Sequence, residues 1–268
     1  MSAAIMLRQS SCIHLMVDAA SYFQDGVIAA LLDKCQAMPE MRCAVTTLGP
    51  SRWQPIVFAA IRENFASFDE AKAGIAPLLQ RLYEEHATAI REPGMWAAAD
   101  VWVIGWSDEI DGPDGLTVSM DDPAEWSSRD GTNPYGRRPF VVDPLSSLGL
   151  NLHPCPSATQ IFEAQFPISL AESDRLVPEI DLLQLLELQR RIPCIHNGRP
   201  FIGGYALLTT VNRSGVGQRR IHTWAEDKVG DLIAPQPIDW KRWRIERERD
   251  LTKGVVPMRF RKGARPHA

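Results

Sequence analysis

The chain opens with two short apolar runs that come close together. Residues 3–7 and 12–18 are mostly apolar, and the polar residues 9–11 separate them. Short apolar runs bounded by turn-forming residues are typical of buried strands. The sequence therefore predicts that the fold begins with a hairpin of buried strands.

Later elements are indicated by changes in the spacing of apolar residues. A turn at residues 25–26 and an apolar run at 42–48 continue the strand pattern, and apolar residues then recur at helical spacing from 53 to 61. A second helix is predicted to begin at the capping box Ser67-x-x-Glu70 and to end near residues 92–94, with Pro77 as a point where it could kink or restart. The remaining pattern predicts strands at 100–107, 116–120 and 139–143, an exposed loop at 121–138, an amphipathic helix at 178–191, and a last hairpin formed by 201–211 and 218–226.

Two helical blocks between three blocks of strands fit a layered α+β protein. With 268 residues, of which 45% are hydrophobic and 23% charged, the chain can bury one sizeable core. No apolar stretch approaches the length of a membrane span, and the first residues lack a signal-peptide pattern, so we expect a soluble, cytoplasmic protein. Five cysteines without a Cys-x-x-Cys pair are expected to be reduced core residues: Cys12, Cys35, Cys43, Cys155 and Cys194.

Three polar residues near the start are evenly spaced. Ser2, Asp18 and Lys34 are separated by 16 residues each, and they accompany the two apolar runs described above. This pattern resembles the opening of a proteasome-type N-terminal-nucleophile (Ntn) hydrolase. In that family a Thr, Ser or Cys exposed as the first residue attacks an amide carbonyl, and its own α-amine is the base. The resemblance implies that Ser2 is the nucleophile once Met1 is removed.

The resemblance also implies roles for the neighbours of Ser2. An α-amine, with a pKa of about 8, suits proton transfer at neutral pH. Lys34 would favour the neutral amine by like-charge repulsion, and Asp18 would keep Lys34 charged and oriented. The family places an oxyanion donor after a strand, here at Gly49, although Pro50 supplies no N–H. Taken singly, these residues also have ordinary explanations: a common second residue, a strand-end cap and a surface charge.

The resemblance covers residues 2–226 and implies a four-layer αββα sandwich of two antiparallel sheets flanked by helices. The segment Gly203-Gly204 resembles the turn that enters the family's eighth strand. The Asp and Ser that support the nucleophile just before this turn in proteasome β-subunits are replaced here by Arg199 and Ile202. Ser157, in a Pro-rich segment, is a candidate for the supporting Ser that the family has in the middle of the chain.

Residues 227–268 are predicted to form a basic C-terminal extension. From 241 to 268 there are ten Lys or Arg and three acidic residues, a net charge of +7, which leaves −11 on the first 240 residues of a chain whose net charge is −4. Such an arm can bind nucleic acid, an acidic partner or a neighbouring copy, or it can remain a solvated terminus. Nucleic acid is the least expected partner because the whole chain is acidic. Aromatic residues among these charges could anchor the arm: Trp240, Trp243 and Phe260.

Two functions remain open on the sequence. One is an amide or peptide hydrolase whose catalytic residues are Ser2, Asp18, Lys34 and Gly49. The other is an inactive Ntn-fold subunit of a larger assembly, such as a virion or a ring, in which the C-terminal arm binds neighbours. A homo-oligomer or larger assembly is expected in either case, with no cofactor. A zinc site is also not expected, because the only set of candidate ligands has unusual one-residue gaps: His153, Cys155, Cys194 and His196.

Overall fold

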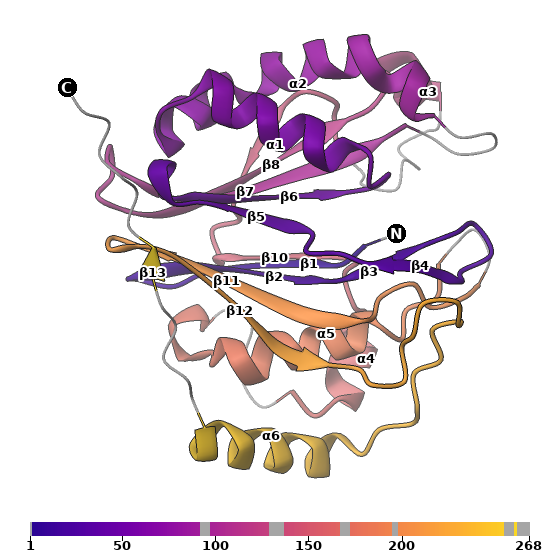
Figure 1. The fold of residues 1–268 in the computed structure, drawn as a ribbon. Coiled ribbons are helices and arrows are strands. Elements are labelled where there is room, and N and C mark those ends of the chain that lie inside the picture. The colour runs from indigo at the N-terminus through magenta and orange to yellow at the C-terminus, as the bar shows by residue number, and fades with distance from the viewer. Residues whose placement is uncertain are drawn as a thin grey trace.

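The computed structural model describes residues 2–91, 97–128, 137–166, 172–194, 198–254 and 260–261. Its larger sheet has six antiparallel strands in the order β10-β1-β2-β11-β12-β13. The first hairpin of the chain, β1 and β2, therefore lies inside this sheet (Figure 1). The strands are β1 (Ala4–Arg8), β2 (Cys12–Asp18), β10 (Leu150–His153), β11 (Tyr205–Asn212), β12 (Gly215–Thr223) and β13 (Phe260–Arg261).

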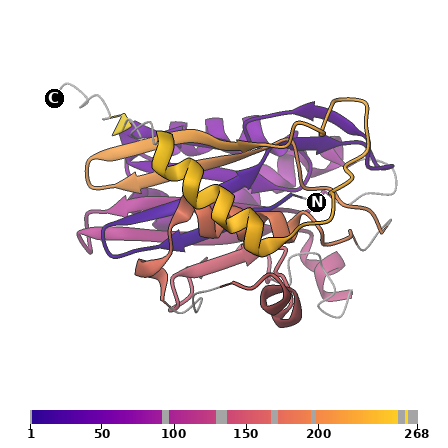
Figure 2. The ribbon, with the colours of Figure 1, turned by 90° about the horizontal axis from the view of Figure 1, so that it is seen from below.

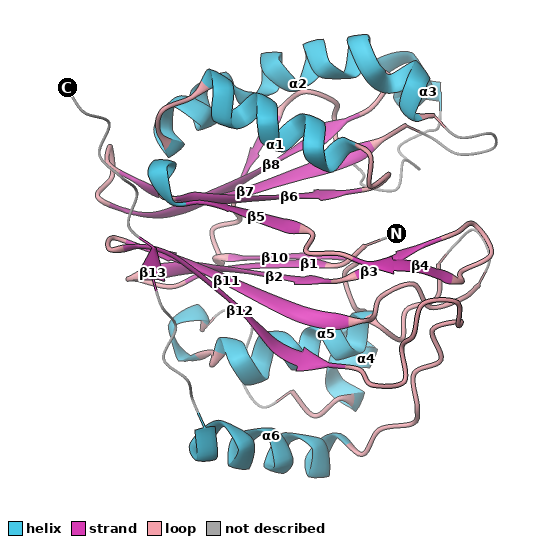
Figure 3. Ribbon diagram, viewed as in Figure 1, coloured by secondary structure: helices cyan, strands magenta, loops and turns pink. Residues whose placement is uncertain are grey.

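A second sheet has five antiparallel strands in chain order, and it faces the first (Figures 1 and 3). A small hairpin, β3 with β4, projects beside the two sheets. The five strands are β5 (Cys35–Met38), β6 (Cys43–Leu48), β7 (Ala99–Ser107), β8 (Gly112–Met120) and β9 (Val142–Pro144), and the small hairpin consists of β3 (Ala20–Tyr22) and β4 (Ile28–Leu31).

Apolar side chains fill the space between the two large sheets. Met6 and Leu15 from the six-stranded sheet belong to one buried cluster with Trp102 and Ile104 from β7. Successive side chains of a strand alternate between its two faces. Ala4 and Met6 thus point toward the other sheet, whereas Ala3 and Ile5 join the cluster on the opposite face.

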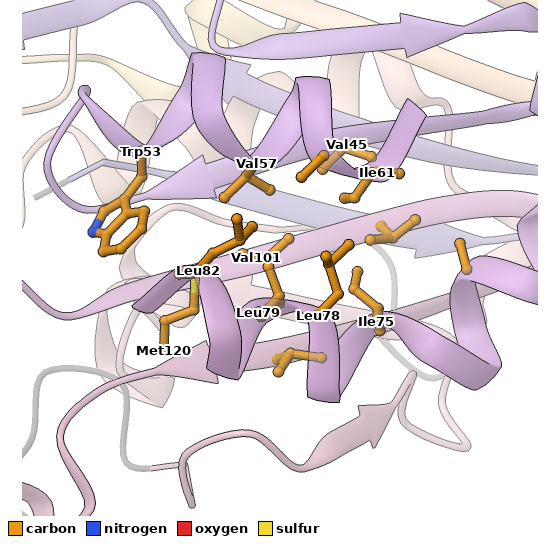
Figure 4. Packing of buried hydrophobic residues seen from close by; sticks show 14 of the residues in the cluster. Val45, Trp53, Val57, Ile61, Ile75, Leu78, Leu79, Leu82, Val101 and Met120 are labelled. Carbon is orange, nitrogen blue, oxygen red and sulfur yellow. The ribbon is translucent and has the colours of Figure 1, made fainter. Parts of the chain in front are cut away.

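Helices α1 (Trp53–Asn64) and α2 (Phe68–Ile90) cover the outer face of the five-stranded sheet. Their apolar faces meet over β6 and β7 in a buried cluster (Figure 4). The members labelled there from the helices are Trp53, Val57, Ile61, Ile75, Leu78, Leu79 and Leu82. The short helix α3 (Pro123–Ser128) follows β8.

The outer face of the six-stranded sheet carries α4 (Ala158–Glu163), α5 (Leu183–Gln189) and α6 (Trp240–Gly254). A helical turn, Pro178–Leu182, leads directly into α5. Figure 2, which looks at this face, shows α6 lying diagonally across it. None of the helices in the described part of the chain is long and apolar enough to cross a membrane.

Several elements predicted from the sequence are confirmed. The N-terminal hairpin, α1, the start of α2 at its Ser67 cap and the last hairpin lie where the patterns placed them. Helix α2 continues through Pro77, which is exposed. It ends at Ile90, close to the expected end near 92–94. Of the loop expected at 121–138, residues 129–136 lie outside the described residues, and its first part forms α3 instead.

Other expectations were wrong. The sequence patterns missed β5 and β10, two four-residue strands that border the candidate site. The helix predicted at 178–191 is not amphipathic in its setting, because all seven residues of α5 are buried. Its polar side is covered by α6: the Arg244 guanidinium donates to Asp181 Oδ1 at 2.8 Å and to Gln184 Oε1 at 3.0 Å.

The C-terminal extension packs, over residues 240–254, on its own chain. Trp240 and Trp243 contact the same buried cluster as α5, and β13 pairs with β12. Contacts also cross the expected boundary at residue 227, since Asp227 is buried and pairs with Arg190. Cys35, Cys43 and Cys194 are buried free thiols as predicted, whereas Cys155 is exposed.

Candidate functional site

The structure brings the side chains of Ser2, Asp18 and Lys34 together. Lys34 Nζ donates hydrogen bonds to both carboxylate oxygens of Asp18, at 2.9 Å each, and to Ser2 Oγ at 3.2 Å. An ammonium group has three N–H donors, so these contacts use all of them. The lysine thereby links the carboxylate to the hydroxyl in one fixed arrangement.

Three chain segments position these side chains. Ser2 lies two residues before β1, Asp18 is the last residue of β2, and Lys34 comes directly before β5. Because β1 pairs with β2, Ser2 and Asp18 lie side by side at one end of the six-stranded sheet. Lys34 reaches them from the five-stranded sheet, where the Thr46 hydroxyl donates to its carbonyl oxygen at 2.7 Å. The site therefore lies where the two sheets meet.

Backbone groups hold the Asp18 carboxylate from three sides. Its Oδ1 accepts the N–H of Ala3 at 3.0 Å, and its Oδ2 accepts those of Ala20 at 3.2 Å and Gly203 at 3.3 Å. Both carboxylate oxygens are therefore held by backbone donors as well as by Lys34, which fixes the orientation of the side chain.

The site is nearly closed to solvent. Ser2 is 7% exposed, Asp18 is fully buried and Lys34 is 3% exposed. Burial lowers the pKa of Lys34 from its ordinary value, while the charge and hydrogen bonds of Asp18 act in the opposite direction. The balance gives a lysine whose proton is held less tightly than that of a surface lysine, beside a hydroxyl group.

Gly49 lies at the end of β6, the strand that pairs with β5 next to Lys34. Its φ is +132°, and a Cβ at this position would lie 2.7 Å from the carbonyl oxygen of Ala98. The position therefore requires glycine. An oxyanion donor binds the carbonyl oxygen of the substrate and not Ser2, so the role of the Gly49 N–H stays a prediction.

A buried ion pair that the sequence did not predict lies behind the Gly203-Gly204 turn. Arg190, at the end of α5, is fully buried and binds the carboxylate of Asp227 through both terminal nitrogens. Asp227 Oδ2 in turn accepts the N–H of Gly204 at 2.7 Å. An arginine in a helix predicted to be amphipathic is expected at the surface. The one feature of the sequence that could have indicated this pair is Gly203-Gly204, because two glycines allow other groups to approach the backbone closely.

Three further residues considered in the sequence for support of the nucleophile, Arg199, Ile202 and Ser157, make other contacts. Arg199 donates to the carbonyl oxygen of Asp25 at 2.9 Å, and Ile202 is buried among apolar side chains of the six-stranded sheet. Ser157 caps α4 by accepting the N–H of Gln160 at 3.2 Å, on the outer face of the same sheet. None of the three donates a described hydrogen bond to Ser2.

For the alternative zinc set, His196 lies outside the described residues. Within the part of the chain that the structure covers, no three His, Cys, Asp or Glu side chains are grouped so as to hold a metal ion.

No protein-family model and no curated protein matches the sequence. Solved structures do match: a Gly-1 mutant of Anbu from Hyphomicrobium sp. strain MC1 has a TM-score of 0.55, covering 94% of this chain and 96% of that one. Anbu from Yersinia bercovieri, described as an ancestral beta-subunit, also has a TM-score of 0.55, covering 93% and 95%. Each is 10% identical in sequence to this chain. The likeness shows a proteasome-like fold built from antiparallel sheets and helices.

Proposed function

We propose that this chain is an Ntn hydrolase with a four-layer αββα arrangement, and that it cleaves an amide or peptide bond. Ser2 is its nucleophile after removal of Met1. The observation that supports this function best is the Lys34 ammonium, held between the Asp18 carboxylate and the Ser2 hydroxyl. A strand end that only packs in the core needs no buried cation. An N-terminal nucleophile does, because the cation favours the neutral form of the α-amine.

In the proposed reaction the Ser2 hydroxyl gives its proton to its own α-amine while Oγ bonds to the substrate carbonyl carbon. The carbonyl electrons move to oxygen, and the amine then passes the proton to the leaving nitrogen as the amide bond breaks. Water, deprotonated by the same amine, attacks the resulting ester and releases the acyl product and free Ser2. The step needs no reactant other than the substrate and water.

Lys34 supports the proposed reaction through its charge. Its ammonium disfavours a second positive charge nearby, and it stabilises negative charge that develops on Oγ. Because Lys34 and Asp18 are buried, water screens this effect little. The N–H of Gly49 is the proposed donor to the oxyanion.

We also propose that the active form is a homo-oligomer or part of a larger protein assembly in the cytoplasm, and that its substrate is a peptide. The description of the Yersinia bercovieri relative as a beta-subunit supports an assembly. The absence of a candidate membrane-spanning helix among the described residues is compatible with this location.

A second candidate function is that of a catalytically inactive subunit with the same fold. It is favoured by Arg199 and Ile202, which replace two side chains that support the nucleophile in the family. The expected contribution of the C-terminal arm to such an assembly is weakened over residues 240–254, since this segment packs on its own chain. The two functions differ in whether Ser2 has a free amine.

The first experiment is the intact mass of the purified protein, followed by a peptide-library assay. We expect loss of Met1, hydrolysis by the resulting protein, no hydrolysis by Ser2→Ala, and retained hydrolysis by Ser2→Thr, which keeps a hydroxyl. Ser157→Ala is the matched control, because Ser157 caps α4 away from the site. Retention of Met1, or equal turnover by Ser2→Ala and the unchanged protein, would favour the inactive subunit.

A further inference from the structure

We propose that the buried Arg190–Asp227 ion pair is a positioning pair for the candidate site. It fixes the turn Ile202-Gly203-Gly204, the turn fixes Asp18, and Asp18 holds Lys34 against Ser2. The catalytic part of this inference rests on the proposed function, whereas the positioning itself can be measured without any substrate.

The ion pair is buried and bidentate, with two parallel hydrogen bonds between the guanidinium and the carboxylate. Arg190 Nη2 donates to Asp227 Oδ1 at 2.7 Å, and Nη1 donates to Oδ2. The Arg190 guanidinium also lies over the ring of Trp224, 4.7 Å from its centroid, and reaches Glu226 Oε1 at 3.2 Å. An arginine held by two parallel bonds has little freedom of orientation.

Both members of the pair bind the backbone of the turn. Arg190 Nη1 donates to the carbonyl oxygen of Ile202 at 2.9 Å, and Asp227 Oδ2 accepts the N–H of Gly204 at 2.7 Å. The peptide groups on the two sides of Gly203 are therefore each tied to a charged side chain. Hydrogen bonds to charged groups are roughly twice as strong as neutral ones, so the pair sets the position of this turn.

The turn in turn binds the end of β2. The Gly203 N–H donates to Asp18 Oδ2 at 3.3 Å, and the Gly203 carbonyl oxygen accepts the N–H of Ala19 at 3.1 Å and of Ala20 at 3.0 Å. One residue, Gly203, thus contacts the Asp18 carboxylate through its N–H and the backbone that follows Asp18 through its carbonyl oxygen. A displacement of Gly203 would move the carboxylate that holds Lys34.

Space around Gly203 shows how closely these groups approach. A Cβ at Gly203 would lie 2.3 Å from Asp227 Oδ2 and 2.5 Å from Arg190 Nη1. The φ of Gly204 is +82°, which favours glycine for a different reason. The glycine pair is thereby explained by the ion pair behind the turn and by the path of the chain into β11.

The pair also addresses the missing support at Arg199 and Ile202. A buried ion pair adds little net stability compared with apolar side chains of similar size. Its value here is a single geometry for the turn, imposed from the side of α5 and of the segment after β12. Support for the candidate nucleophile then comes from behind the turn and not from side chains on it.

The test measures the pKa of Lys34 by NMR in protein labelled at the side-chain carbons of its six lysines. Asp227→Asn removes the charge of the pair with almost no change in size. We expect the pKa of Lys34 to fall further, since Asp18 is displaced and its opposing effect is reduced. We also expect kcat for peptide hydrolysis to fall on the order of 10²-fold at an unchanged KM, as a small misplacement does.

Arg190→Lys is the second variant, and it serves if Asp227→Asn does not fold. It keeps the buried charge but cannot make two parallel bonds, so we expect a smaller change in the same direction. Asp181→Asn is the matched control: Asp181 is also a buried aspartate paired with an arginine, Arg244, but it has no contact with the turn. It should lower stability and leave both the Lys34 titration and kcat unchanged.

The outcomes separate the two proposals. If the unchanged protein hydrolyses peptides and the Lys34 titration is the same in all variants, the positioning inference is overturned and the proposed function stands. If no peptide is hydrolysed but Asp227→Asn and Arg190→Lys shift the Lys34 titration, the positioning is supported and the proposed function fails. Equal losses of stability in Asp227→Asn and Asp181→Asn, without a Lys34 shift, identify the pair as structural only.

Discussion

The ammonium of Lys34 lies 3.2 Å from the hydroxyl of Ser2. The two residues precede strands of different sheets and are 32 residues apart in the sequence. The other two donors of Lys34 are bound to Asp18, so the cation cannot turn away from the hydroxyl without losing contacts that water does not replace. A buried ion pair stabilises a fold little compared with apolar side chains of similar size. Variants of Lys34 should therefore be tested for hydrolysis as well as for stability.

Lys34→Met should reduce the free energy of unfolding by about 3–5 kcal/mol, because it leaves the Asp18 carboxylate buried without its cation. It should also abolish the proposed hydrolysis. Urea titration at pH 7 measures the first effect. Lys72→Met is the control: the Lys72 side chain is 38% exposed and pairs with Asp114, so its loss should cost roughly 1 kcal/mol or less. Equal losses in both variants would contradict the view of Lys34 as a buried charge.

Much of the fold could be predicted because its long elements carry strong periodic patterns. The 12 residues of α1 and the 23 of α2 repeat apolar residues at helical spacing, and the last hairpin has long strands joined by a polar turn. The strands β5 and β10 were missed since each has four residues of mixed character. Segments that short give no clear period. The position of β5 depends on its pairing with β6. The position of β10 depends on its pairing with β1, which lies far from it in the sequence.

The candidate site divides in the same way. Ser2, Asp18 and Lys34 were recognised from their spacing and from the resemblance to a family, and the structure brings them together. Arg190 and Asp227 could not be found, since charged residues are normally at the surface. Arg190 is buried against Asp227 and Trp224, which lie more than 30 residues further along the chain, and no local pattern reports such a contact.

Gly49→Ala should destabilise the protein by about 1–3 kcal/mol and lower any hydrolytic activity. The φ of +132° is strained for alanine, and its Cβ would press on the Ala98 carbonyl oxygen at 2.7 Å. Thermal unfolding followed by circular dichroism checks this. Gly230→Ala is the control, because Gly230 also has a positive φ, +94°, outside the ordinary left-handed helical range, but nothing lies within 4 Å of the added Cβ. A loss no larger at Gly49 than at Gly230 would show that the end of β6 can yield.

Stability should fall with decreasing pH through His14, at the end of the fold that carries the β1–β2 turn. Burial and the charge of Arg219 lower the pKa of His14 to about 4 from 6.5. The Thr210 hydroxyl lies 2.8 Å from Nδ1 and Gln9 Oε1 lies 2.9 Å from Nε2. Because Gln9 Oε1 can only accept, a neutral ring with its proton on Nε2 satisfies both contacts. Protonation of Nδ1 would turn this nitrogen into a donor, so the Thr210 hydroxyl would have to rotate and accept, while the buried ring gains a charge beside Arg219.

The sign follows from the order of the two pKa values. As the pH drops below 6.5 the unfolded chain binds a proton at His14 and the folded chain does not, so stability is lost until the pH reaches about 4. Over that window the loss from this residue is about 3 kcal/mol. Urea titrations at several pH values should show that the free energy of unfolding of His14→Gln depends less on pH between 6.5 and 4 than that of the unchanged protein. His86→Gln is the control, since the His86 side chain is 41% exposed, and it should keep the pH dependence of the unchanged protein.

Arg244→Met should destabilise the protein far more than Arg242→Met, although both residues lie on α6 two positions apart. Arg244 pairs with the fully buried Asp181, whereas the Arg242 side chain is 78% exposed and pairs with Glu246 on the same helix. Removing the partner of a buried carboxylate costs about 3–5 kcal/mol, and an exposed pair within a helix contributes about 0.3–0.5 kcal/mol. The midpoints of urea unfolding measure the difference. If α6 instead served mainly to bind a neighbouring copy, the two variants would unfold at similar urea concentrations in dilute protein, and light scattering would show a loss of assembled mass.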